Sequence, residues 1–222
     1  MTTLDESETD AFKELFNLSF SKAAATLSEM VDAEVTLSLP CLSMLPRPAV
    51  AEHIHSLYGT SIGLVGMRFQ FEFSPDNSIH GMAVLMIRAS DIGHLLDALY
   101  GSHIPDEKVA ELEEEALQLA GAVLLYTCTS SLSALFASEI VAEKPNFFKG
   151  DPAGLNEYLV CSDWPEKSSA TASNEQHDLL MLRVDFSLLG KEVYGSLLTW
   201  MDGEGLPSLK VEIDHFIAAH MV

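Results

Sequence analysis

The chain has 222 residues, 48% of them hydrophobic, and its 33 acidic and 12 basic side chains give a formal net charge of −21. This length and apolar content predict a substantial buried core. The excess of carboxylates repels phosphate backbones and anionic lipid, so nucleic acid and membrane surfaces are not expected as partners.

Three scattered cysteines, Cys41, Cys128 and Cys161, match neither a disulfide framework nor a metal site. The acidic N-terminal residues do not resemble an export signal. Both observations predict a cytoplasmic protein. An uncharged run over residues 116–138 is long enough to span a bilayer, but its hydroxyl side chains and acidic flanks favour a buried helix of a soluble protein.

The first long helix is predicted to begin at Ser7 to Thr9, either of which can cap it, and to end near Asp32. Its apolar residues recur every three or four positions and predict one buried stripe: Phe12, Phe16, Phe20, Ala23, Leu27 and Met30. At 100° per residue, four polar side chains on the opposite face point within about 60° of one another: Glu14, Asn17, Ser21 and Ser28. By spacing alone, an acid and an amide on a wet face are usually no more than solvated residues.

The elements that follow alternate between extended and helical patterns. A β-branched strand at 34–39 is closed by Pro40, and a short helix ends at Gly59. Two extended runs, joined by a Ser-Pro-Asp-Asn-Ser turn, predict an antiparallel hairpin over 64–73 and 79–87. A helix over 91–100 follows, with Ser90 as its cap and Gly101 as its end.

The pattern then repeats. A shift of 105 positions places the first helix on the second, and it also places Glu34 on Glu139 and Pro40 on Pro145. A hairpin returns at a shift of 114, which places Gly81 on Gly195. The repetition predicts one domain over 1–222 with repeats at about 8–101 and 111–220, the second ending in a helix over 206–220. The expected fold class is α+β, with long helices packed on a mostly antiparallel sheet that has pseudo-twofold symmetry.

Between the two halves of the second repeat lies a polar segment, about 150–178, which we expect to be a long loop around a strand at 157–161.

The two long helices differ along the outward stripe, which is polar in the first helix and apolar in the second. Leu119 and Ala122 occupy the positions of Glu14 and Asn17, so the second copy has lost whatever those two residues do. With Tyr126 on the same stripe, the second helix is apolar nearly all round and is expected to be covered on more sides.

Few other residues form a chemical site. None of the eight histidines is paired with Cys or Glu at a metal spacing, and His53 and His55 are best interpreted as a helix-surface pair. No phosphate-binding loop or nucleophile elbow is present. The carboxamide of Asn17 can donate and accept at once, and therefore can orient a water molecule, while the carboxylate of Glu14 can pair with a lysine. Neither is a nucleophile, which fits an enzyme acting on a bond already activated in another protein.

The run Glu14-Leu-Phe-Asn17, with Asp10 before it and Ala23-Ala-Ala-Thr-Leu-Ser28 after it, resembles the E-x-x-N helix of the CheC/CheX/FliY family of CheY-phosphate phosphatases. The duplicated plan, with its Gly81 and Gly195 hairpins, is similar to that family over nearly the whole chain. The resemblance implies that Asn17 orients water toward the aspartyl phosphate of a response regulator and that Glu14 contacts the regulator's lysine. It also implies that the magnesium belongs to the regulator, so that the chain needs no cofactor or metal of its own.

Asp10 and Ser21 are candidate docking residues on the same stripe. The chain departs from the family pattern in its bulky Phe16, Phe20 and Lys22, and in the single motif left by Leu119 and Ala122. We expect a cytoplasmic chemotaxis phosphatase whose partner is a phosphorylated CheY-like regulator. Two alternatives remain open: a non-enzymatic module that binds a flagellar-switch or receptor-modifying protein, and a homodimeric scaffold built on the second helix.

Overall fold

The computed structural model describes residues 4–46, 49–59, 61–74, 77–101, 103–136, 138–150, 178–202 and 206–220. The expected polar loop lies almost entirely outside these ranges, as does the expected strand at 157–161. The strands are β1 (Val35–Leu37), β2 (Cys41–Pro46), β3 (Ile62–Ser74), β4 (Asn77–Arg88), β5 (Glu139–Ala142), β6 (Asn146–Gly150), β7 (Asp178–Leu188) and β8 (Val193–Asp202). The helices are α1 (Glu6–Val31), α2 (Ala49–Tyr58), α3 (Ile92–Tyr100), α4 (Asp106–Phe136) and α6 (Leu206–His220), with a 3-10 turn η1 (Ala89–Asp91) before α3.

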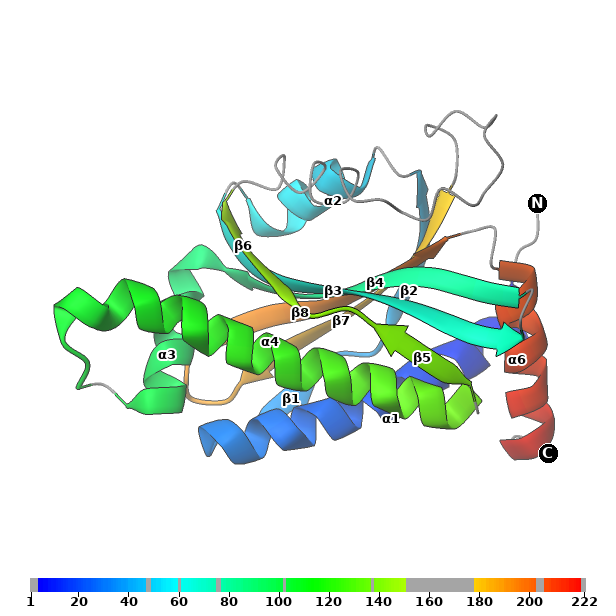
Figure 1. The fold of residues 1–222 in the computed structure, drawn as a ribbon, viewed down its shortest axis with the longest axis horizontal. Helices are drawn as coiled ribbons and strands as arrows, with labels where there is room; N and C mark the ends of the chain where they lie inside the picture. Colours follow the sequence, from blue (N-terminus) through cyan, green and yellow to red (C-terminus); the bar gives the residue numbers. More distant parts are fainter. Residues whose placement is uncertain are drawn as a thin grey trace.

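The eight strands in the described part of the chain belong to one antiparallel sheet, which curls around the core (Figure 1). The order is β1-β7-β8-β4-β3-β5, and β2 and β6 extend β7 and β3 respectively. In the predicted repeat, β1 corresponds to β5, β3 to β7 and β4 to β8. Exchanging these counterparts gives the same strand order, read from the opposite edge of the sheet. The arrangement agrees with the predicted repeat, although the duplication itself stays a prediction. The α+β class and the antiparallel sheet are confirmed.

The join between the halves is the β4–β8 pair. Gly81 lies opposite Met201 and Gly195 lies opposite Ile87, so each glycine occupies the matching place in the two strands. At both glycines an aromatic ring from the neighbouring strand fills the space above the backbone: Phe69 lies over Gly81 and Phe186 over Gly195. The absence of a side chain therefore lets these rings pack directly on the sheet.

The helices cover both faces of the sheet. Helices α1 and α4 lie side by side, run in opposite directions and cover one face, while α2 lies on the other (Figure 1). Phe12, Phe16, Phe20 and Leu27 of α1 are almost completely buried in the larger core on the first face. A smaller core forms between α2 and the second face, where Val50 and Ile54 pack around Trp200. The predicted helices α1, α2, α3 and α6 and the predicted hairpin β3–β4 are thus confirmed.

A capping box fixes the beginning of α1. The backbone N–H of Glu8 donates to the Asp5 carboxylate at 2.9 Å, and the N–H of Asp5 donates to Glu8 Oε2 at 2.7 Å. The buried Glu8 also forms an ion pair with Lys210 of α6, at 2.7 Å. The predicted cap at Ser7 to Thr9 is therefore wrong, because the N-cap is Asp5, which lies before all of these residues and pairs with Glu8 in the capping box.

The two long helices end alike. The Ser28 hydroxyl donates to the Ala33 carbonyl at 2.7 Å, and the Ser133 hydroxyl donates to the Ser138 carbonyl at 2.5 Å. At the end of α1, Asp32 adopts a left-handed conformation with φ 46°. The strands that follow these two helix ends, β1 after α1 and β5 after α4, lie at opposite edges of the sheet.

Helix α3 does not use its predicted cap. The hydroxyl of Ser90 donates to the Asp91 carboxylate at 2.6 Å instead of to the helix backbone, and Ser90 lies within η1. Gly101, with φ 83°, ends the helix as predicted.

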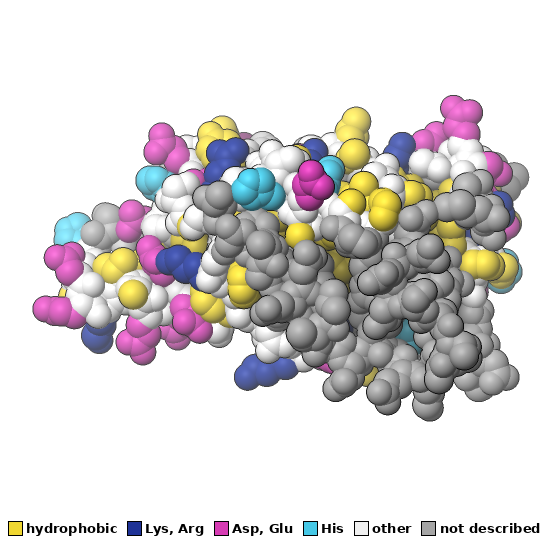
Figure 2. All heavy atoms as spheres, turned by 90° about the horizontal axis from the view of Figure 1, so that it is seen from above, with side chains coloured by type: hydrophobic (Ala, Val, Ile, Leu, Met, Phe, Trp, Pro, Cys, Tyr) yellow, Lys and Arg dark blue, Asp and Glu magenta, His cyan; other side chains and the backbone are white. Residues whose placement is uncertain are grey.

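Helix α4 begins ten residues before the uncharged run and carries six acidic side chains in its first ten residues. Acidic side chains gather at this end of the molecule (left in Figure 2). Among the described helices, α4 contains a stretch long and apolar enough to cross a membrane, and 56% of its most apolar window is buried in the fold. The expectation that α4 is covered on more sides is wrong on its outer stripe, where Leu119 is 41% exposed and Tyr126 is 43% exposed.

Candidate functional site

The candidate site is the outward stripe of α1, formed by Asp10, Glu14, Asn17 and Ser21. Glu14, Asp10 and Ser21 are exposed, and Asn17 is half-buried. These residues follow one another at spacings of four, three and four, so the helix places all four side chains on one face. The structure therefore brings together the predicted site residues and the candidate docking residues.

The opposite side of α1 holds this stripe in place. Phe12 and Phe16 pack with ring centroids 4.7 Å apart, and Phe16 and Phe20 with centroids 5.6 Å apart. All three rings are almost completely buried between α1 and the rest of the core. Since a rotation of α1 would expose these rings to water, the outward direction of Glu14 and Asn17 is strongly determined.

Glu14 and Asn17 make no hydrogen bond or ion pair with any residue that the structure describes, although Asp10 approaches Lys13 at 3.8 Å. A carboxylate and a carboxamide without partners can bind groups of an approaching molecule. They supply an acceptor from Glu14, and an acceptor and two donors from Asn17. They do not supply a nucleophile.

The counterpart positions on α4 are equally accessible. Leu119 is exposed and Ala122 is half-buried, matching the exposure of Glu14 and Asn17. These counterpart positions are therefore accessible but carry no polar side chain, and the loss of a second site stays a prediction.

A polar cluster that sequence reasoning missed connects α2 to the sheet. The Tyr58 hydroxyl donates to Ser196 Oγ, and Ser196 donates to the Asp185 carboxylate, which Arg183 approaches at 3.4 Å. Burial raises the pKa of Tyr58 to about 12, so the phenol stays neutral at physiological pH. Tyr58 and Ser196 are 138 positions apart and belong to no motif, so no local signal could have joined them.

The remaining candidate groups stay separate. His53 and His55 lie on α2 as predicted. No group of three or more His, Cys, Asp or Glu side chains is placed to hold a metal ion among the residues with described positions. Cys128 is buried, and burial raises the pKa of its thiol well above the usual range, so it is unreactive.

No protein-family model matches the chain. A curated relative, the flagellar motor switch phosphatase FliY of Bacillus subtilis, is 24% identical over 144 residues, which cover 64% of this chain and 35% of the relative. The match thus spans about a third of that protein's length.

The fold matches solved structures over more of the chain. FliY of Thermotoga maritima superposes with a TM-score of 0.67 at 15% identity, covering 97% of this chain and 100% of that one. FliM from a FliG–FliM complex of H. pylori superposes with a TM-score of 0.52 at 13% identity, covering 94% of this chain and 100% of that one.

The curled antiparallel sheet, with two long antiparallel helices on one face, defines the class: an α+β fold shared by the FliY and FliM structures. Within this class the sequence match is to FliY. The predicted resemblance to the CheC/CheX/FliY family of CheY-phosphate phosphatases is thereby confirmed.

Proposed function

We propose that the chain is a phosphatase that hydrolyses the aspartyl phosphate of a CheY-like response regulator, and that Glu14 and Asn17 enter the regulator's active site. The observation that carries the proposal is an acid and an amide one turn apart on the outward face of α1, neither of which has a hydrogen-bond or ion-pair partner among the described residues. The match to a relative named as a phosphatase supports it.

In this proposal the reacting groups come mostly from the partner. The acyl phosphate is already activated, and the regulator supplies the magnesium that neutralises charge on the phosphoryl oxygens. The Asn17 carboxamide holds a water molecule in line with the phosphorus. The water oxygen bonds to phosphorus, the bond from phosphorus to the aspartate oxygen breaks, and the regulator recovers its carboxylate as inorganic phosphate leaves.

Glu14 fixes the position of the regulator. Its carboxylate pairs with a regulator lysine, and this contact sets the register that brings Asn17 to the phosphoryl group. Asp10 and Ser21 extend the contact along α1. The proposal includes the predicted cytoplasmic location and requires no metal or cofactor of the chain itself.

Replacing Glu14 by glutamine tests the anchoring role. We expect a rise in KM of about three- to thirtyfold with a smaller change in kcat, because the lost ion pair acts mainly in docking. Steady-state phosphate release over a range of phosphorylated regulator concentrations separates the two constants. A fall in kcat with KM unchanged would instead place Glu14 in the chemical step.

The central experiment measures phosphate release from a panel of CheY-like receiver domains charged with a small phosphodonor, with and without the chain. Faster release from one or more of them supports the phosphatase proposal and identifies the substrate. Equal release from every receiver domain would overturn it.

A second candidate function is a non-enzymatic binding module of the flagellar switch. Two observations favour it: the likeness of the fold to FliM, which was crystallised in a complex with FliG, and the apolar residues Leu119 and Ala122 at the positions on α4 that correspond to Glu14 and Asn17. Fold alone does not decide between the two functions. Binding of a phosphorylated receiver domain without any change in its decay rate would select the binding module.

A further inference from the structure

An open depression lies between α1 and α4, on the flank of the Glu14–Asn17 stripe. It has a volume of about 360 Å³, and its walls come from both helices. Its lining residues are Lys22, Tyr126, Thr127, Ser130, Ser131 and Ala134. Nothing in the proposed mechanism uses them.

The side chains in this depression are nearly all hydrogen-bond donors. Lys22 contributes an ammonium group, and four residues of α4 contribute hydroxyl groups. Within the described part of the chain, none of these five side chains donates or accepts a hydrogen bond. An ammonium group beside hydroxyl groups is a binding site for an anionic oxygen, such as that of a carboxylate.

Lys22 differs from the other lysine of α1 and from the lysines that contact α1 and α4. Lys13, Lys149 and Lys210 approach a carboxylate at 3.8, 3.0 and 2.7 Å respectively. Lys22 is exposed and has no acidic partner among the residues that the structure describes. Its charge is therefore available to an anion from outside.

The position of Lys22 connects the depression to the proposed catalytic stripe. Lys22 follows Ser21 directly and lies five residues beyond Asn17, a rise of about 7 Å along the helix axis. At 100° per residue its side chain points away from the stripe, toward α4. A protein domain that covers Asn17 would therefore also cover the depression, whereas the phosphoryl group at Asn17 would not reach it.

The occupant also follows from charge. A receiver domain that binds magnesium and a phosphoryl group uses carboxylates to hold the metal, so acidic side chains surround its active site. In the proposed function Glu14 pairs with the regulator's lysine, so a carboxylate of the regulator needs a cation elsewhere on α1. Lys22 is the lysine of α1 that has no acidic partner among the residues that the structure describes. We propose that Lys22, with the hydroxyl groups of α4, binds a surface carboxylate of the docked regulator. This inference rests on the proposed function and adds a second contact that determines affinity.

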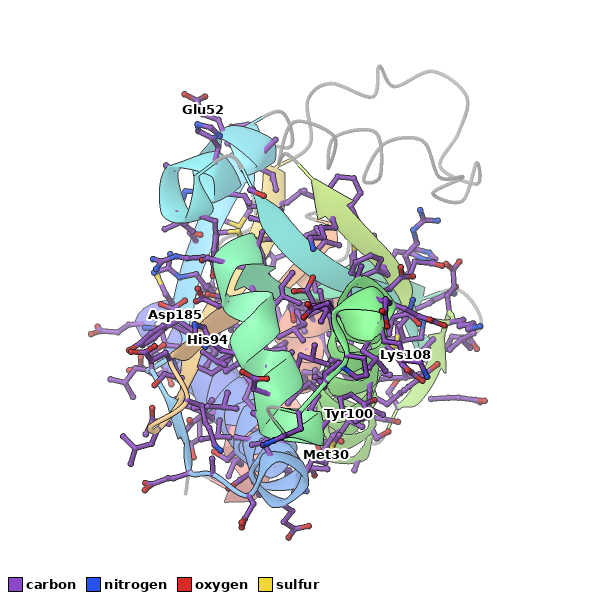
Figure 3. The ribbon with its side chains drawn as sticks, turned by 90° about the vertical axis from the view of Figure 1, so that its left-hand side faces the viewer. Met30, Glu52, His94, Tyr100, Lys108 and Asp185 are labelled. Atoms are coloured by element: carbon purple, nitrogen blue, oxygen red, sulfur yellow. The ribbon has the colours of Figure 1, made fainter. Side chains whose placement is uncertain are left out.

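The test is Lys22→Glu. We expect KM for the phosphorylated regulator and Kd for the regulator carrying beryllofluoride to rise about tenfold at low salt, and less at high salt, because a charge at the edge of an interface is screened. We expect kcat at saturating regulator to change less than twofold. The matched control is Lys108→Glu, which makes the same charge change at the other end of α4 (Figure 3), 18 residues or about 27 Å along the helix from Tyr126. It should leave both constants within twofold of wild type.

Restoring charge complementarity provides the decisive measurement. A regulator in which one surface carboxylate has been replaced by lysine should bind Lys22→Glu more tightly than it binds wild type. If Lys22→Glu matches wild type in KM and Kd while wild type accelerates dephosphorylation, the inference is overturned and the phosphatase proposal stands. If wild type binds without acceleration and Lys22→Glu weakens that binding, the inference stands and the phosphatase proposal is overturned.

Discussion

Replacing Asn17 by alanine should remove most of the acceleration of regulator dephosphorylation, by a factor of about 10 to 1,000. A lost group that orients the attacking water removes a few kcal/mol of transition-state stabilisation, and each tenfold loss in rate corresponds to about 1.4 kcal/mol. The carboxamide has no hydrogen-bond partner within the described structure, so its removal breaks no hydrogen bond there. Alanine is also the best helix former, so α1 should remain intact.

The measurement is the decay of phosphorylated regulator in the presence of each variant, at concentrations that saturate the regulator. Binding of the beryllofluoride-loaded regulator should change less than threefold, because Glu14 and Lys22 still provide the docking contacts in our proposal. Asn17→Asp is the isosteric control: it keeps the shape but loses the amide donors and places a negative charge against the phosphoryl group. We expect it to be as slow as Asn17→Ala. Acceleration by Asn17→Ala equal to that of wild type would remove Asn17 from the mechanism.

The candidate site is predictable from sequence because it depends on a single helix. The alternation of Phe12, Phe16 and Phe20 with Glu14 and Asn17 fixes which face of α1 is buried, whatever packs against it. Helix periodicity is a local property, and so is the end of α3 at Gly101, whose positive φ of 83° favours glycine. These features needed no knowledge of the sheet.

The strands β2 and β6 show where local reasoning fails. Each is short, and each is defined by its pairing with a distant partner, β7 for β2 and β3 for β6. The prolines near them, Pro46 and Pro145, suggest loops when the sequence is read alone. An edge strand needs only one side of its backbone to pair, so tertiary contacts outweigh the local signal.

The outer stripe of α4 was predicted wrongly for a similar reason. Its apolar residues suggested a helix covered on more sides than α1, yet Leu119 and Tyr126 remain exposed in the chain by itself. Sequence composition reports how apolar a helix is, and not whether the chain supplies a second layer to cover it. The depression beside Tyr126 likewise depends on how α1 and α4 pack, so it could be found only from the structure.

Replacing Gly195 by alanine should destabilise the fold by about 1 to 3 kcal/mol, the typical cost of overpacking a core position. An added Cβ would lie 2.5 Å from ring carbons of Phe186 and 2.8 Å from the carbonyl oxygen of Met86. The ring belongs to β7 and the carbonyl to β4, so the new methyl group would push against both neighbours of β8 at once. The ring is buried in the core and cannot move without opening it.

Urea unfolding of wild type and variant measures this change in free energy. The matched control is Gly93→Ala in α3, where an added Cβ meets Glu113 Oε1 at an ordinary 3.7 Å and alanine should stabilise the helix by up to about 1 kcal/mol. Combining Gly195→Ala with Phe186→Leu should recover part of the loss, since the smaller side chain yields space, and the coupling should reach about 0.5 to 3 kcal/mol. If Gly195→Ala unfolds at the same urea concentration as wild type, then the close packing of Gly195 against Phe186 and Met86 does not limit the size of the side chain at this position. The close contact of the two halves at the β4–β8 pair would then contribute nothing to stability.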